Sequence, residues 1–199
     1  MAGTSERLFV AIDIGEEVRR QVSRVISTLA ASLEGATRPP KVAWVKPNAL
    51  HVTIKFLGEV DRPDIERVQA LLSPPIAVAP FEIEWRGLGT FPNNRHPRAL
   101  WVGVVNGAAS LARVEAEVSR RLAGDKAFDL DDRAFLPHLT IGRVKMAGDG
   151  VDWPRLLQSV EIRQARSAVD RVTLYRSQLS QFGPHYTGLV SAPLIAPPS

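Results

Sequence analysis

The chain contains one four-residue word twice, as His51-Val52-Thr53-Ile54 and as His138-Leu139-Thr140-Ile141. Both copies read His, apolar, Thr, apolar, and each lies in a run of β-branched and apolar residues that predicts a strand. A chain of this length and composition supplies roughly 0.03 copies of the pattern by chance. The repetition therefore indicates two related segments with a shared function.

Alternation along a strand sorts the residues of each word onto two faces. His51 and Thr53 point to one face, and Val52 and Ile54 point to the other. The second word has the same arrangement. Each word therefore anchors an apolar pair in a core and presents an imidazole beside a hydroxyl.

Two imidazoles and two hydroxyls in one cleft suit the cleavage of a phosphodiester. A neutral imidazole can take a proton from an attacking water, and an imidazolium can give one to the leaving oxygen. The ordinary histidine pKa near 6.5 makes both forms available close to neutral pH. The threonine hydroxyls can hydrogen-bond the phosphoryl oxygens as charge develops on them. This chemistry requires no metal.

The segments that precede the two words repeat one order of elements. A strand over 7–13 and a helix over 16–33 precede the first word, and a strand over 99–105 and a helix over 111–122 precede the second. Several strands follow one another through connections too short for a crossover helix, which favours antiparallel sheets. We therefore predict an α+β fold with two pseudo-symmetric lobes, each an antiparallel sheet with flanking helices, around a central cleft.

The lobes should form one bilobal domain over 1–191, because the two words lie in related segments of it. The end of the chain, 192–199, carries three prolines and should be loose. Two further histidines, His96 and His185, lie outside the words, and we expect a solvated and a structural role for them. No role is evident for the polar loop 125–133. Further strands are expected at 42–45, 81–85, 169–175 and 186–190.

The composition excludes several classes of function. The 199 residues include no cysteine, which rules out disulfides, zinc ribbons, iron–sulfur clusters and thiol nucleophiles. No His-x-His or Glu-x-x-His spacing suggests a metal site, and no glycine-rich phosphate loop is present. A net charge of +4 is compatible with a phosphate-bearing partner. Without a long apolar run or a secretory leader, we expect a cytoplasmic protein that does not contact a membrane.

The words and the residues around them resemble a known family. Twin His-x-Thr-x motifs are the signature of the two-histidine phosphoesterase superfamily. Within it, the chain resembles the bacterial and archaeal RNA 2',3'-cyclic phosphodiesterases, also called the 2'-5' RNA ligase family. The flanking stretches that carry the likeness are Arg7-Leu8-Phe9-Val10-Ala11-Ile12-Asp13, Phe56-Leu57-Gly58-Glu59, Arg143-Val144-Lys145 and Val172-Thr173-Leu174-Tyr175-Arg176-Ser177.

The resemblance implies a bilobal fold with pseudo-twofold symmetry and hydrolysis of an RNA-terminal 2',3'-cyclic phosphate to a 2'-phosphate, without metal or cofactor. It implies that His51 gives a proton to the departing 3' oxygen and that His138 takes one from water. Thr53 and Thr140 would hold phosphoryl oxygens. The reverse reaction, joining of 2'-5' linked ends, is a weak side activity of relatives.

The resemblance also implies residues that bind the substrate. Arg143 matches an arginine that reaches the phosphate, and its fork of donors suits that role. Phe56 or Tyr175 would stack the terminal base, although either ring could equally belong to the core. The implied partners are RNA 3' ends that carry a cyclic phosphate, tRNA fragments among them, and we expect a monomer.

Other functions stay open at the level of sequence. The enzyme could act on small cyclic nucleotides or on an ADP-ribose cyclic phosphate, as other branches of the superfamily do. A non-catalytic module could hold RNA ends and show salt-sensitive binding without turnover. A metal-assisted hydrolase is the least favoured alternative.

Overall fold

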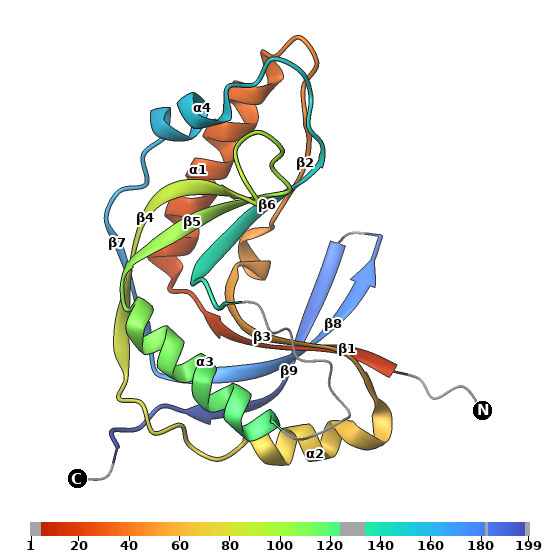
Figure 1. Ribbon diagram of the computed structural model, residues 1–199, viewed down its shortest axis with the longest axis vertical. Helices are drawn as coiled ribbons and strands as arrows, with labels where there is room; N and C mark the ends of the chain where they lie inside the picture. The colour runs from red at the N-terminus through yellow and green to blue at the C-terminus, as the bar shows by residue number, and fades with distance from the viewer. Residues whose placement is uncertain (1–4, 124–133, 182, 198–199) are drawn as a thin grey trace.

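Two antiparallel sheets and four α-helices make up the protein in the computed structural model, which describes residues 5–123, 134–181 and 183–197 (Figure 1). The loop 125–133 lies outside the described residues. The elements, in chain order, are β1 (Ser5–Asp13), α1 (Glu16–Glu34), β2 (Lys41–Trp44), a 3-10 turn η1 (Pro47–Ala49), β3 (His51–Asp61), α2 (Arg62–Leu72), β4 (Phe81–Phe91), β5 (Ala99–Asn106), α3 (Ala108–Leu122), β6 (His138–Met146), α4 (Trp153–Ser159), β7 (Ala165–Val169), β8 (Arg171–Ser180) and β9 (Gly183–Pro193).

The two sheets have the same internal plan. The first has the strand order β3-β1-β8-β9, and the second has the order β2-β6-β5-β4-β7. Without β2, the second sheet matches the first strand by strand, since each motif strand, β3 or β6, pairs with the strand that opens its repeat, β1 or β5. The predicted α+β class with two related antiparallel sheets is confirmed.

Each long helix packs on the sheet of the other repeat. The helix α1 follows β1 of the first sheet but contacts β7 and β6 of the second sheet, together with α4. The helix α3 follows β5 of the second sheet but contacts β3 of the first, together with α2 (Figure 1). Their buried faces carry valine and leucine at spacings of three and four, so that each forms one apolar stripe. This exchange of helices joins the two lobes through one continuous apolar core.

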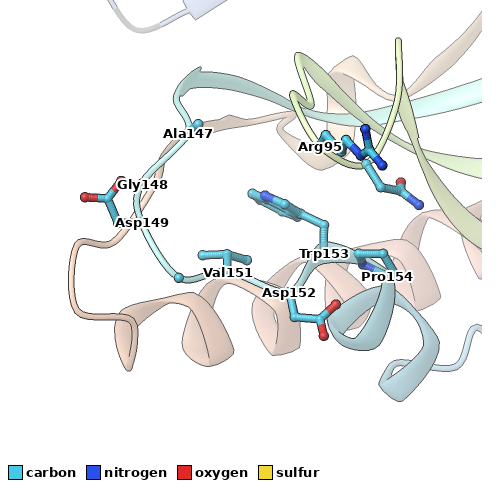
Figure 2. A pocket seen from close by; sticks show the side chains of 10 residues that line it. Arg95, Ala147, Gly148, Asp149, Val151, Asp152, Trp153 and Pro154 are labelled. Atoms are coloured by element: carbon cyan, nitrogen blue, oxygen red, sulfur yellow. The ribbon is translucent and has the colours of Figure 1, made fainter.

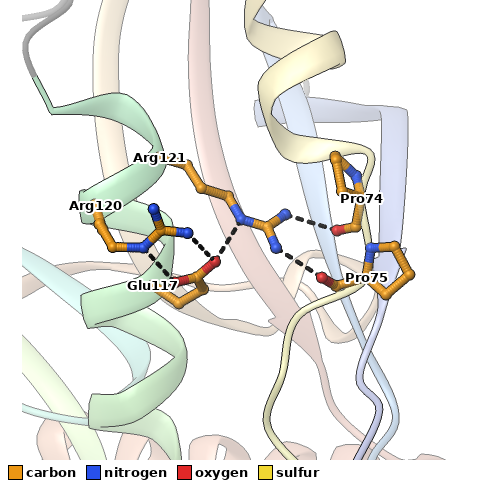
Figure 3. A network of polar contacts seen from close by, with 5 residues as sticks. All are labelled: Pro74, Pro75, Glu117, Arg120 and Arg121. Atoms are coloured by element: carbon orange, nitrogen blue, oxygen red, sulfur yellow. Dashed lines mark hydrogen bonds and ion pairs between the residues drawn. The ribbon is translucent and has the colours of Figure 1, made fainter. Parts of the chain in front are cut away.

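A polar network fixes the end of α2 against α3 (Figure 3). Arg121 donates hydrogen bonds to the carbonyl oxygens of Pro74 at 2.6 Å and Pro75 at 2.7 Å, and its Nε donates to Glu117 at 2.8 Å. Glu117 also accepts two hydrogen bonds of 2.8 Å from Arg120. The Arg120 hydrogen bonds, ahead of the contribution of Arg121, lower the pKa of Glu117 to about 2. The network satisfies two carbonyls of the turn that carries the chain from α2 towards β4.

Several strands differ from the predictions. The strand predicted at 81–85 runs on to Phe91, and the strand predicted at 186–190 covers Gly183–Pro193. The strand that begins at His51 continues past Gly58, which adopts a φ of 74° at a bulge, and ends only at Asp61. The single strand predicted over 169–175 is two strands, β7 and β8, in different sheets.

The expectation of a loose segment from residue 192 is wrong for its first part. Ala192 and Pro193 still pair with β8, and Leu194 is only 4% exposed. The backbone N–H of Ile195 donates to the carbonyl oxygen of Ile76 at 3.0 Å. Apolar side chains of this segment are buried and its backbone groups are bonded, so the prolines do not prevent docking. Among the described residues, no helix is both long and apolar enough to cross a bilayer.

Candidate active site

The two motif histidines lie at the junction of the two sheets. The motif strands β3 and β6 begin at His51 and His138 and contact one another. The charge of His138 acts on His51, and the Arg143 guanidinium acts on both rings. We call the sheet surfaces that carry these rings the histidine faces. The structure thus brings together the two imidazoles and the arginine that the sequence analysis singled out.

Each imidazole is oriented by the same backbone contact. The Nδ1 atom of His51 lies 2.8 Å from the carbonyl oxygen of Ala49, and that of His138 lies 2.7 Å from the carbonyl oxygen of Leu136. A carbonyl oxygen only accepts, so Nδ1 carries the proton and donates it in both rings. This leaves Nε2 of each ring as the reactive nitrogen. In His51, Nε2 also lies 3.1 Å from the Thr53 hydroxyl of the same motif.

Burial lowers the pKa of both histidines below the ordinary value of 6.5. For each ring the carbonyl hydrogen bond opposes this effect, and the Arg143 charge adds to it. The two sites differ in their other charged neighbours: the Asp13 carboxylate raises the pKa of His51, whereas the charge of His138 lowers it. Asp13 is the carboxylate among the described residues that favours the imidazolium form of His51.

Four aromatic side chains pack around His51, and we call them the aromatic group: Phe9, Phe56, Tyr175 and Tyr186. The Phe9 ring is only 3% exposed and lies 4.9 Å from the His51 ring, 5.5 Å from Tyr175 and 5.0 Å from Tyr186, between centroids. The Tyr186 ring meets the His51 ring edge-on at 5.2 Å. Phe56 lies at the margin of this group, 6.3 Å from Phe9, and is 45% exposed. The arrangement fixes the His51 imidazole and leaves the Phe56 ring open to solvent.

His138 has a smaller aromatic support. The Phe91 ring meets it edge-on at 4.9 Å, and Trp101 lies 5.2 Å behind Phe91. The Trp101 indole lies against Gly89, where any side chain would collide with it. Glycine at this position therefore lets the indole approach β4 closely while it supports Phe91.

A β-bulge occurs at the fourth residue of each motif, and it changes which residue follows on the histidine face. The registers skip Ile54 in β3 and Ile141 in β6. Beyond the bulge the alternation reverses, so that Phe56 and Arg143, each five positions after its histidine, share the face of the motif. Lys55 points the other way and forms an ion pair of 3.1 Å with Glu115 of α3.

The partners across the strands differ between the two motifs. His51 lies opposite Asp13, whereas His138 lies opposite Gly103. The Tyr175 hydroxyl donates to both Asp13 oxygens at 2.9 and 2.8 Å, and burial together with this bond raises the Tyr175 pKa to about 12. Tyr175 therefore stacks on Phe9 and holds the Asp13 carboxylate beside His51.

Sequence reasoning missed Asp13, Phe9 and Tyr186 as parts of the site. The alternation within 7–13 places Phe9 and Asp13 on one face, and this signal could have singled them out. Tyr186 carries no local signal, because only the pairing of β8 with β9 brings it to His51. His96 and His185 are exposed and stand outside the aromatic group.

A shallow pocket of about 430 Å³ lies elsewhere, between the loop after β4 and the loop from β6 to α4 (Figure 2). Arg95 and Trp153 line it, at the end of β6 far from His138. Two acids at its rim have structural partners. Asp149 pairs with Arg38 at 3.1 Å, and Asp152 accepts the backbone N–H of Arg155 at the start of α4. In the described ranges, no three His, Asp or Glu side chains gather as metal ligands.

Comparisons with known proteins agree with this architecture. The family model of the 2'-5' RNA ligase superfamily matches residues 20–181. An RNA 2',3'-cyclic phosphodiesterase of Thermotoga maritima is 35% identical, over 90% of this chain and 91% of that protein. One from Methanothermobacter thermautotrophicus is also 35% identical, over 92% and 96%. The chain therefore belongs to the 2'-5' RNA ligase superfamily, as the twin motifs indicated.

Solved structures show the same fold. The crystal structure of TT0787 of Thermus thermophilus superposes with a TM-score of 0.71 at 29% identity, covering 96% of this chain and 98% of that one. E. coli LigT in complex with 3'-AMP superposes with a TM-score of 0.68 at 25% identity, covering 96% and 99%. The paired sheets are thus shared with a protein that binds a nucleotide.

Proposed function

We propose that the protein hydrolyses RNA-terminal 2',3'-cyclic phosphates to 2'-phosphomonoesters by two-histidine general acid–base catalysis without a metal. The observation that carries this proposal is the pair of imidazoles, each with Nδ1 bonded to a backbone carbonyl, so that Nε2, which in His51 meets the Thr53 hydroxyl, is the nitrogen for proton transfer. The names of the Thermotoga and Methanothermobacter relatives support the choice of substrate.

The proton transfers balance within the site. His138 Nε2 takes a proton from water, whose oxygen attacks the phosphorus. The bond from phosphorus to the 3' oxygen breaks, and His51 Nε2 gives its proton to that oxygen. The products are a 2'-phosphomonoester and a free 3' hydroxyl. The family resemblance assigns the acid to His51, and Asp13 supports that assignment, because its carboxylate favours the protonated form of this ring.

The phosphate side of the site would consist of Thr53, Thr140 and Arg143. The two hydroxyls lie two residues after their histidines and share their faces. The Arg143 guanidinium is exposed on the same face and can donate two parallel hydrogen bonds to phosphoryl oxygens. Charge that develops in the transition state would meet these donors without reorganisation.

The base side would consist of Phe56 and Tyr175. Phe56 offers an exposed ring for stacking on the terminal base. Tyr175 would support this side of the site indirectly, because its own ring is stacked on Phe9 and its hydroxyl is bound to Asp13. Joining of 2'-5' linked ends would be the same proton transfers run in reverse. We expect a cytoplasmic monomer that acts on RNA fragments, those of tRNA included.

The test is turnover of an oligonucleotide that ends in a 2',3'-cyclic phosphate, in EDTA, at several pH values between about 5 and 8. We expect a 2'-phosphate product and losses of ~10²–10⁴-fold in His51→Ala and His138→Ala. His185→Ala, which removes an exposed histidine outside the aromatic group, is the matched control. Cyclic mononucleotides and an ADP-ribose cyclic phosphate serve as alternative substrates. Absence of product, or activity that requires a divalent ion, would overturn the proposal.

A further inference from the structure

An arginine, Arg7, stands on the histidine face of the first sheet. Arg7 lies two residues before Phe9 on β1, and the two share a face because side chains alternate along the strand. The residues of the other face, Leu8 and Val10, belong to the apolar core. Arg7 is exposed and lies opposite Ser177 of β8. The histidine face therefore extends from His51 past the aromatic group to Arg7.

Electrostatics connects Arg7 with the site. Burial raises the pKa of Tyr186, and the charges of Arg143 and Arg7 both oppose that rise. Tyr186 therefore lies within reach of two guanidinium groups from different sheets, while its ring touches His51. Arg7 lies one strand repeat of about 6.6 Å beyond Phe9, and the Phe9 ring itself contacts both His51 and Tyr186.

The neighbouring Arg176 of the first sheet forms an ion pair with an acidic side chain, whereas Arg7 does not. Arg176 lies on the opposite face and bonds to Glu6 at 3.2 Å. Glu59, which lies across from Arg7, accepts the Ser5 hydroxyl at 3.2 Å. Among residues 5–123, 134–181 and 183–197, none forms a hydrogen bond or ion pair with the Arg7 guanidinium, whose residue is held in the sheet by its backbone. A free guanidinium near the site is suited to an anion of the ligand.

We propose that Arg7 binds the phosphodiester that precedes the terminal nucleotide, so that the enzyme prefers oligonucleotide ends to cyclic mononucleotides. This inference rests on the proposed function. With the cyclic phosphate between the two histidines and Arg143, and the base against Phe56, the next phosphate of the strand lies one nucleotide away. Arg7 is the cation that the first sheet offers there, and the Ser177 hydroxyl beside it can donate a further hydrogen bond.

Two substrates separate this role from a general effect of charge. A nucleoside 2',3'-cyclic phosphate has no preceding phosphate, and a dinucleotide with the same terminal residue has one. We expect Arg7→Gln to lower kcat/KM for the dinucleotide by about 10- to 100-fold more than for the mononucleotide. Arg7→Lys should restore part of that difference. Arg163→Gln, which removes an exposed charge in the loop before β7, should leave the ratio of the two substrates unchanged.

A change in the substrate provides the reciprocal test. A dinucleotide with an uncharged methylphosphonate linkage should lose its advantage with the wild-type enzyme and should not distinguish wild type from Arg7→Gln. The salt dependence of log KM for the natural dinucleotide should become shallower by about 0.7 in the variant. Equal losses on both substrates, or none, would overturn the role of Arg7 while leaving the proposed function intact. A wild-type enzyme inactive on both substrates would overturn the two proposals together.

Discussion

Two phenylalanines of one aromatic group should respond to mutation in opposite ways. Phe9 is 3% exposed with ring contacts to His51, Tyr175 and Tyr186, whereas Phe56 is 45% exposed. Loss of a buried phenylalanine side chain lowers the free energy of unfolding by about 3–5 kcal/mol. Complete burial of such a side chain contributes about 1.5–3 kcal/mol, so truncation of the half-exposed Phe56 should lower it by only about 1 kcal/mol.

For substrate binding, the substitution of Phe56 should have the larger effect, although it has the smaller effect on stability. Removal of a ring that stacks on a base costs about 1–3 kcal/mol of binding. Phe56→Ala should therefore raise KM by about 5- to 150-fold with little change in kcat. Phe9→Leu keeps most of the volume and should cost less than about 1.5 kcal/mol of stability. Because it removes the ring that supports His51, it should lower kcat more than it raises KM.

Urea unfolding followed by tryptophan fluorescence and by circular dichroism measures the stability part. The four tryptophans lie on β2, β4, β5 and α4, which belong to the second lobe. Phe9 lies in the first sheet. Since the helices are exchanged between the lobes, Phe9→Ala should shift the fluorescence midpoint as far as the circular dichroism midpoint. Equal stability losses for Phe9→Ala and Phe56→Ala, or a KM unchanged in Phe56→Ala, would refute the reasoning.

Three further predictions concern charge. Burial lowers the pKa of His51 and His138 below 6.5, so kcat/KM, which reports the free enzyme, should peak below pH 6.5; a peak in the alkaline range would contradict this assignment. Asp13→Asn removes the carboxylate that raises the His51 pKa, so the high-pH limb of that profile should move to lower pH while the low-pH limb, set by His138, stays. If the low-pH limb moves instead, the roles of the histidines are exchanged. Glu117→Gln should lower the free energy of unfolding by about 1 kcal/mol at neutral pH, because Glu117 accepts two hydrogen bonds from Arg120 and one from Arg121. Since the folded-state pKa of Glu117 is about 2 against an ordinary 4.5, the stability difference should be complete above pH 4.5 and should close as pH falls towards 2, in urea unfolding at each pH.

The motif faces could be predicted from the sequence because strand alternation is a local property. Alternation places His51 and Thr53 together, and the cross-strand registers agree. The same rule applied one step further would have put Lys55 on the histidine face. The bulge at Ile54 reverses the alternation and brings Phe56 there instead. A bulge depends on pairing with β1, which no single-strand pattern contains.

Interactions between distant segments account for the other differences. The apolar stripe of α1 predicts a helix, but it does not say which sheet the stripe covers. The segment from Ala192 to Ile195 looks like a loose end by composition, yet Leu194 is buried and the backbone bonds to Ile76. Tyr186 reaches His51 only through the β8–β9 hairpin. In each case, the partner that determines the structure is remote in sequence.

The two repeats give the site a symmetric framework, and residues that differ at a few equivalent positions make the site asymmetric. Both motifs hold their imidazoles by the same carbonyl contact and bulge at the same residue. Opposite His51 stands Asp13, and opposite His138 stands Gly103, so only His51 has a carboxylate as its cross-strand partner.

Five positions after each histidine, the first repeat has Phe56 and the second has Arg143, an apolar ring on one side and a cation on the other. A cyclic phosphate on a nucleoside is asymmetric in the same sense, since it has a base on one side and anionic oxygens on the other. If the acid and base roles follow from these two differences, exchanging the cross-strand residues Asp13 and Gly103 should change how the pKa values of His51 and His138 compare. The double variant Asp13→Gly with Gly103→Asp should raise the pKa of His138 relative to that of His51, as measured by NMR titration of the two rings. An unchanged order of the two pKa values would show that something other than the cross-strand carboxylate distinguishes the histidines.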